Sequence, residues 1–172
     1  TSSLLAPKKR AWSTSTYSDS TGTLVRFWPD NNIFITLVFN KDILESRLRE
    51  LAYLNRGVRI ILIDQREKEE NGSAYSNVFY SEGGIVEFVE MLDKNASRNA
   101  LIPKVIFVEG KDNNTNVAVE VALSYNDSYN EHIYSYVNNI NTIEGGTHVS
   151  GFRRALTRVF KSYGDKNGLF EK

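Results

Sequence analysis

The sequence predicts an α+β protein in which helices pack on one face of a mainly antiparallel sheet. Three observations lead to this class. Segments whose apolar side chains alternate come in groups, and helical segments lie between them at irregular intervals. One extended segment, residues 116–126, has valine and leucine on one face and alanine and glutamate on the other, which is typical of an antiparallel sheet with one covered face. Three segments carry apolar side chains at the spacing of a helix.

The composition is that of an ordinary globular domain. The 172 residues are 41% apolar and 24% charged, and the formal net charge is zero, so a nucleic-acid role requires a local cationic patch. The chain has no cysteine and two histidines, which excludes disulfides and thiolate metal sites and disfavours a histidine-built metal site. The longest apolar run, about seven residues at 33–39, is far shorter than the ~20 needed to cross a bilayer. We expect no membrane partner and interpret the chain as an excised piece of a larger cytoplasmic protein.

The amino-terminal part of the chain divides into a lead-in and the start of the predicted domain. Residues 1–21 are rich in serine and threonine without a clear period, and we expect a loose lead-in or linker there. The predicted domain covers residues 22–172. It starts with an alternating strand over residues 22–29, which Pro29 ends. The apolar segment 32–40 fits either a strand or a helix, and its state stays open.

The next segment is predicted to be a helix from Asn40 to Leu54. Asn40 is a suitable N-cap, and Gly57 is a suitable stop just beyond the end. The apolar stripe of this helix consists of Ile43, Leu44, Leu48, Leu51 and Leu54.

A hairpin and a second helix are expected to follow. Residues 58–64 predict a mostly buried strand, residues 65–74 a charged hairpin tip, and residues 76–81 a short strand. Residues 82–95 predict a helix. Its apolar positions are Ile85, Phe88, Val89 and Leu92.

The last third of the chain predicts three strands and a helix. The strands are expected over residues 104–110, 116–126 and 131–140, with a hairpin turn at residues 126–128 between the last two. The helix is expected over residues 148–163. Its apolar stripe consists of Val149, Phe152, Leu156, Val159, Phe160 and Tyr163.

The sequence Val-Glu-Gly-Lys-Asp at residues 108–112 resembles the glutamate motif of Toprim nucleases. That chemistry also needs an Asp-x-Asp pair to hold the metal, and the chain contains no such pair. We therefore favour a hairpin turn at Glu109 and Gly110.

Glycine pairs precede two of the predicted helices, at residues 83–84 and 145–146. Each pair can direct backbone N–H groups at a phosphate, but neither is followed by the Lys-Ser/Thr of a phosphate-binding loop. A tight strand-to-helix turn, with Thr147 as the cap of the last helix, is the favoured interpretation.

His148 lies four residues after Glu144, an arrangement that admits acid–base catalysis. No nucleophile accompanies the pair, so a side chain at the start of a helix is favoured. His132 is expected in a strand. We assign no catalytic, cofactor-binding or metal-binding residue. The structural turn motif is predicted to consist of Glu144, Gly145, Gly146, Thr147 and His148.

The last predicted helix is cationic. No acidic residue occurs between Val149 and Tyr163. A solvated charged face and a contact with the phosphates of duplex DNA are both consistent with this pattern, and the absence of acids favours DNA. The DNA-facing candidates are Arg153, Arg154, Arg158 and Lys161.

The stretch YVNNINTIEGGTHVSGFRRALTRVF, residues 136–160, resembles the transducer domain of the bacterial DNA gyrase B family of type IIA topoisomerases. Four other stretches agree in the same order: GTLVRFWPD, RLRELAYLNRGVRI, YSEGGIVEFVEMLDKN and VEVALSYNDSY. The resemblance covers about residues 22–172.

This resemblance implies a transducer with the ribosomal-S5-domain-2-like fold, which carries the nucleotide state to DNA strand passage. The implied partners are double-stranded DNA, gyrase A and a second copy bound through the full ATPase region. The implied cofactors are ATP and Mg²⁺, and the implied location is the bacterial cytoplasm. The family's Mg-ATP motif, nucleotide lid and Gln-Thr-Lys loop are not in this sequence, so we expect the isolated chain neither to hydrolyse ATP nor to cleave DNA. The equivalent component of topoisomerase IV and a free-standing nucleic-acid-binding module remain alternatives.

Overall fold

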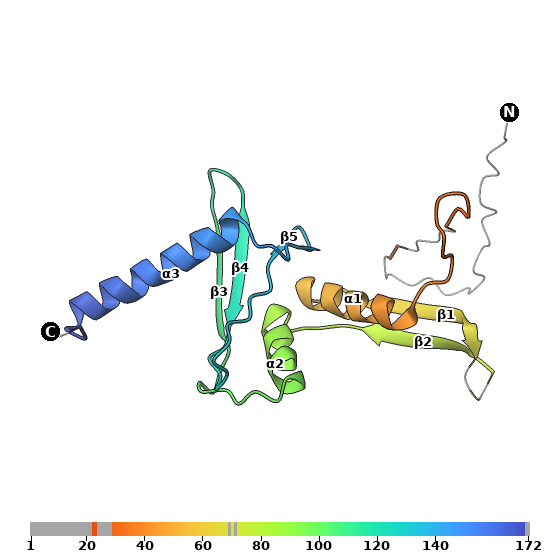
Figure 1. Ribbon diagram of the computed structural model, residues 1–172, viewed down its shortest axis with the longest axis horizontal. Coiled ribbons are helices and arrows are strands. Elements are labelled where there is room, and N and C mark those ends of the chain that lie inside the picture. The colour runs from red at the N-terminus through yellow and green to blue at the C-terminus, as the bar shows by residue number, and fades with distance from the viewer. Residues whose placement is uncertain (1–21, 24–28, 69, 71, 171–172) are drawn as a thin grey trace. The chain divides into compact units, whose positions relative to one another are not determined.

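The computed structural model describes residues 22–23, 29–68, 70 and 72–170. The chain divides into two compact units, residues 1–39 and residues 40–172, and the helices and strands assigned in the described part all lie in the second unit (Figure 1). The predicted lead-in at residues 1–21, and most of the predicted strand at 22–29, lie outside the described residues. The ambiguous segment 32–40 forms neither a helix nor a strand.

The first helix, α1 (Lys41–Leu54), begins and ends as the sequence predicts. The Asn40 side chain accepts a hydrogen bond from the Ile43 N–H at 3.1 Å. Gly57 follows the helix with a φ of 82°, in the left-handed region that glycine adopts at little cost. The predicted apolar stripe is wrong at one position, because the Ile43 side chain is not covered and is 68% exposed. The helix contacts the hairpin that follows it and the second helix, α2 (Ile85–Asn95).

That hairpin consists of β1 (Ile60–Lys68) and β2 (Ala74–Phe79), which pair antiparallel from Ile60–Phe79 to Lys68–Ala74. The register shifts between Asp64 and Lys68, as a β-bulge does. The predicted hairpin tip at residues 65–74 is therefore too long. The residues after Asp64 continue the strand as far as Lys68, and the Asp64 carboxylate binds the Arg66 side chain on the same strand.

The second helix, α2 (Ile85–Asn95), buries Phe88 as its spacing predicts. The Phe88 ring stacks on Tyr53 of α1, with ring centroids 5.3 Å apart. Tyr134 and Tyr136 lie at 6.0 and 6.4 Å from the same ring. Phe88 is thus the centre of an aromatic cluster that joins α1, α2 and residues 134–136.

The second hairpin consists of β3 (Ile106–Lys111) and β4 (Ala118–Leu123). The predicted turn at Glu109 and Gly110 is wrong, because Glu109 pairs with Glu120 inside the ladder. The chain turns later, where the Asp112 carboxylate accepts hydrogen bonds from the Asn114 N–H and the Thr115 hydroxyl. α2 contacts β4.

The valine-rich face predicted for residues 116–126 is only partly covered. Val117 and Val119 are each 55% exposed, whereas Val121 and Leu123 are half-buried. The predicted turn at residues 126–128 is wrong as a hairpin turn. Asn126 instead forms an isolated antiparallel bridge with Ala100, beyond α2.

The predicted strand at residues 131–140 is also wrong. Residues 131–135, including His132, have no regular secondary structure. The strands here are β5 (Tyr136–Val137) and β6 (Ile140–Asn141), which pair with each other. Asn138 and Asn139 turn the chain between them with φ of 50° and 65°. Asparagine tolerates this left-handed conformation better than most residues.

The last helix, α3 (Thr147–Lys166), extends three residues beyond its predicted end (Figure 1). The α+β class with antiparallel strands is confirmed. In the described residues the strands form three two-stranded sheets, β1–β2, β3–β4 and β5–β6. Within this described part, no helix is both long and apolar enough to cross a membrane.

Candidate nucleic-acid interface and the turn before it

The predicted turn motif spans the start of α3: Glu144, Gly145 and Gly146 lie in the turn, and Thr147 and His148 are the first two residues of the helix. Gly145 has a φ of 76°, in the left-handed region where other residues are strained. Gly146 is the N-cap, and a Cβ added there would lie 2.9 Å from Cε1 of His148. A side chain at either position therefore conflicts with the backbone or with the histidine ring.

Thr147 does not cap the helix, so the predicted cap is wrong. Thr147 is the first helical residue, and no side chain makes a capping hydrogen bond at Gly146. The two glycines bring the chain into α3 without a threonine oxygen at its first N–H groups. The N–H groups of the first turn carry partial positive charge at this end of the helix.

His148 is tied to Thr142, the residue directly after β6. Its Nε2 lies 3.1 Å from Oγ1 of Thr142, and Oγ1 of Thr142 donates to the Ser135 carbonyl at 3.0 Å. The imidazole is oriented by a neutral threonine, whereas the Glu144 side chain is exposed. The geometry matches an orienting contact and not a base poised against a nucleophile.

A cavity of about 380 Å³ lies at this turn, and its lining includes Glu144, Ser150 and Arg153. The Arg153 guanidinium is not free in it, because its Nη2 lies 2.8 Å from a carboxylate oxygen of Glu131. Both side chains of this pair are more than half exposed, so the ion pair is weak. Glu131 is 22 residues from Arg153, and no local pattern indicates their contact.

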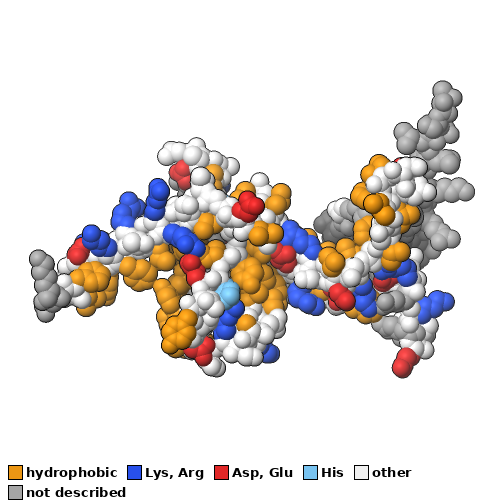
Figure 2. Space-filling model, in the orientation of Figure 1, with side chains coloured by type: hydrophobic (Ala, Val, Ile, Leu, Met, Phe, Trp, Pro, Cys, Tyr) orange, Lys and Arg blue, Asp and Glu red, His pale blue; other side chains and the backbone are white. Residues whose placement is uncertain are grey.

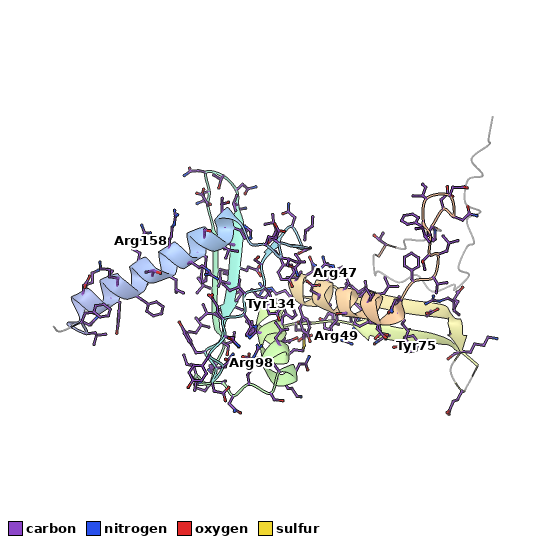
Figure 3. All side chains as sticks on the ribbon, in the orientation of Figure 1. Arg47, Arg49, Tyr75, Arg98, Tyr134 and Arg158 are labelled. Carbon is purple, nitrogen blue, oxygen red and sulfur yellow. The ribbon has the colours of Figure 1, made fainter. Side chains whose placement is uncertain are left out.

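The other three cationic candidates form a row. Arg154, Arg158 and Lys161 are spaced by four and three residues, so they lie on one face of α3, and all three are exposed. The row spans roughly 10 Å along the axis at ~1.5 Å per residue. Figure 2 shows lysine and arginine along one side of this helix and hydrophobic side chains along another. Arg158 points away from the helix in Figure 3.

The apolar stripe of α3 is covered only in its first half. Val149, Phe152 and Leu156 are half-buried. Val159, Phe160 and Tyr163 are 62%, 53% and 61% exposed. The helix is amphipathic as predicted, with a cationic face that is open to solvent.

The turn before α2 differs from the turn before α3, because nearby side chains accept hydrogen bonds from the backbone N–H groups of its two glycines. The Gly84 N–H donates to Oγ of Ser81, and the Gly83 N–H donates to Oε1 of Glu87, both at 2.8 Å. The Ser81 hydroxyl donates to Oε2 of Glu87 at 2.6 Å. A carboxylate thus already sits where a phosphate would bind. A serine three residues before Gly84 is the sequence feature that would have indicated these hydrogen bonds.

Nowhere in the described residues does a group of three or more His, Asp or Glu side chains form a possible metal site. The residues that sequence analysis missed are Arg47, Asn55 and Asn139. Their side chains and backbone join α1 to the β5–β6 turn. The Asn-Asn pair at residues 138–139 is the feature that would have indicated a two-residue turn there.

Comparison with known proteins identifies the class. Residues 84–172, just over half of the chain, match the family DNA gyrase B. The 43K ATPase domain of Thermus thermophilus gyrase B, solved with an aminocoumarin, superimposes with a TM-score of 0.68 and 32% identity over 84% of this chain and 37% of that one. The B-subunit of DNA gyrase from Myxococcus xanthus gives a TM-score of 0.64 and 27% identity over 76% of this chain and 39% of that one. The fold is thus that of a segment of a gyrase-type ATPase region.

Sequence relatives lead to the same family. DNA gyrase B of Chitinophaga japonensis is 65% identical over 152 residues, which is 88% of this chain and 32% of the relative. DNA gyrase B of Eisenibacter elegans is 56% identical over 155 residues, 90% of this chain and 32% of the relative. The chain belongs to the DNA gyrase B family, and it spans about a third of the length of these relatives.

Proposed function

We propose that this chain is the transducer segment of a gyrase B ATPase region, which couples ATP binding and hydrolysis to DNA strand passage and negative supercoiling. The observation that carries the proposal is the superposition of 84% of the chain on a gyrase B ATPase domain, together with an open cationic face on α3. In this proposal ATP and Mg²⁺ bind in other parts of the parent protein. The working assembly contains gyrase A and a second copy of the ATPase region, in the bacterial cytoplasm.

The role of the segment in this proposal is mechanical. Binding of nucleotide elsewhere closes the dimer, and rotation of a stiff segment carries that closure to the DNA. The aromatic cluster around Phe88 supports such stiffness, because its ring stacks on Tyr53 of α1 at 5.3 Å and also lies 6.0 and 6.4 Å from the rings of Tyr134 and Tyr136. The α2 turn supports it too, since its N–H groups hold Glu87 and Ser81 of the same chain.

The DNA contact in this proposal is the α3 row of Arg154, Arg158 and Lys161, with Arg153 beside it. Neutralising phosphates with lysine or arginine releases counterions, and this supplies sequence-independent affinity. A duplex that passes through an enzyme must be held without reading its sequence, and an exposed row of cations that contacts phosphates meets that need.

The test uses the full-length parent protein mixed with gyrase A and relaxed plasmid. We expect ATP-dependent introduction of negative supercoils, and no ATP hydrolysis or DNA cleavage by residues 1–172 alone. ATP-dependent decatenation and relaxation without supercoiling would instead indicate a component of topoisomerase IV. Binding of DNA by the parent protein with no effect of ATP on topology would contradict the proposal and favour a nucleic-acid-binding module.

A further inference from the structure

Asn139 joins the β5–β6 turn to α1 by two hydrogen bonds. Its side-chain amide donates to Oδ1 of Asn55 at 2.9 Å. Its carbonyl oxygen accepts from Nη2 of Arg47 at 2.5 Å. The bonded residues are 84 and 92 positions apart in the chain. Asn139 is half-buried, so these bonds are better shielded from water than those of an exposed loop.

Both partners on α1 are themselves fixed. Asn55 ends the helix, and its Nδ2 and backbone N–H both donate to the Leu51 carbonyl, at 2.8 and 3.0 Å. Nη1 of Arg47 lies 2.6 Å from Oε2 of Glu50. Oδ1 of Asn55 and the guanidinium of Arg47 are therefore held in place by contacts at α1 that do not involve Asn139. Figure 3 labels Arg47 on α1.

The turn that Asn139 closes leads directly into α3. Residues 142–146 are all that separate β6 from the first residue of that helix. Within them, the Thr142 N–H donates to the Ser135 carbonyl at 2.8 Å, and Oγ1 of Thr142 contacts His148 at 3.1 Å. A continuous set of hydrogen bonds thus runs from α1 through Asn139 and the short hairpin to the first turn of α3.

We propose that Asn139 is a positioning residue that fixes the cationic helix α3 relative to α1, so that displacement of one element displaces the other. The inference rests on the proposed function and names one connection through which the segment transmits movement. Without the Asn139 amide, the hairpin keeps its turn, and of the two hydrogen bonds from Asn139 to α1 only that of its carbonyl with Arg47 remains, beside the contact of Tyr136 with Glu50. Movement of α1 is then absorbed by rotation of the hairpin before it reaches α3.

Asn139→Gly is the informative variant, because it removes the amide while glycine accepts the left-handed φ of 65°. Asn138→Gly is the matched control. Asn138 has a similar φ of 50°, and in the described part of the chain no side-chain hydrogen bond joins it to α1. The full-length variants are assembled with gyrase A, and supercoils formed are counted per ATP hydrolysed.

We expect Asn139→Gly to lower the number of supercoils per ATP by roughly two- to tenfold, with ATP hydrolysis by the full-length variant close to that of the parent. Asn138→Gly should leave the ratio unchanged. Asn55→Ala tests the same bond from the other side, and the double variant should be no worse than Asn55→Ala alone. A parental ratio for Asn139→Gly, or an equal loss for Asn138→Gly, would overturn the inference. Absence of supercoiling by the parent protein would contradict the proposed function itself.

Discussion

Asp64 and Arg66 form a two-point ion pair on β1, two residues apart. Nη2 of Arg66 lies 2.6 Å from Oδ2 of Asp64, and Nε of Arg66 lies 2.9 Å from Oδ1. The Arg66 N–H also donates to Oδ1 at 2.9 Å. Asp64 is 8% exposed. The hydrogen bonds from the Arg66 side chain, and then that from its N–H, lower the pKa of Asp64 from 3.8 to about 2.

The first prediction concerns acid stability. Because the pKa of Asp64 is lower in the folded chain, its contribution to the free energy of unfolding is present above pH 3.8 and is lost as the pH falls towards 2. Asp64→Asn should therefore be less stable than the parent chain at pH 7, and the difference should shrink between about pH 4 and about pH 2. Urea unfolding at several pH values measures this. Arg66→Met should show the same loss of pH dependence, and a difference that stays constant down to about pH 2 would contradict the assignment.

The second prediction concerns the aromatic cluster. Phe88 is 8% exposed and has three ring neighbours, so Phe88→Ala should lower the free energy of unfolding by about 3 kcal/mol. Tyr129 is the control, because it is fully exposed at 105%. Tyr129→Ala should change the free energy of unfolding by less than about 0.5 kcal/mol. Equal losses for the two variants would mean that the cluster does not organise the fold.

Local chemistry made much of the fold predictable. Asn40 as the cap of α1, Gly57 as its stop and Phe88 as the buried residue of α2 each follow from rules that act within one helix, and the structure has all three. The error at residues 126–128 arises from a contact between residues that are distant in the sequence. Asn126 suits a hairpin turn by itself, yet its backbone bridges Ala100.

The candidate site was likewise predictable only in part from local sequence. The cationic row on α3 follows from helical spacing, and the structure leaves it exposed. The ion pair of Arg153 with Glu131 and the bond of Asn139 with Asn55 join residues that no local pattern connects. The cap expected of Thr147 is not formed, because Gly146 is the N-cap and Thr147 is already the first helical residue.

The third prediction compares two glycines near the start of α3. Gly145 has a φ of 76°, and Gly145→Ala should cost about 1 kcal/mol of stability or more because alanine is strained there. Gly151 is inside the helix, and nothing lies within 4 Å of an added Cβ. Gly151→Ala should therefore increase stability by roughly 0.5 to 1 kcal/mol. Thermal unfolding of the two variants tests this, because the expected changes in stability have opposite signs. Destabilisation by both substitutions would show that α3 tolerates no change near its start.

The fourth prediction concerns DNA. Each lysine or arginine that neutralises a phosphate contributes about 0.9 to the slope of log affinity against log salt. Arg154→Gln with Arg158→Gln should therefore reduce the slope for a short duplex by about 2, and Arg154→Glu with Arg158→Glu should weaken binding further through repulsion. Titrations at several salt concentrations, with residues 1–172 and a fluorescent duplex, give the slope.

The control for this experiment removes the same charge elsewhere. Arg49 and Arg59 are exposed and stack on Phe79 and Tyr80, at 5.6 and 5.5 Å from the ring centroids. If α3 is the contact surface, Arg49→Gln with Arg59→Gln should leave the slope near the parental value, because net charge alone does not place phosphates against a helix. Equal reductions for the two double variants would mean that DNA responds to the total charge of the chain. An unchanged slope for the α3 variant would exclude the row of Arg154, Arg158 and Lys161 as the DNA contact.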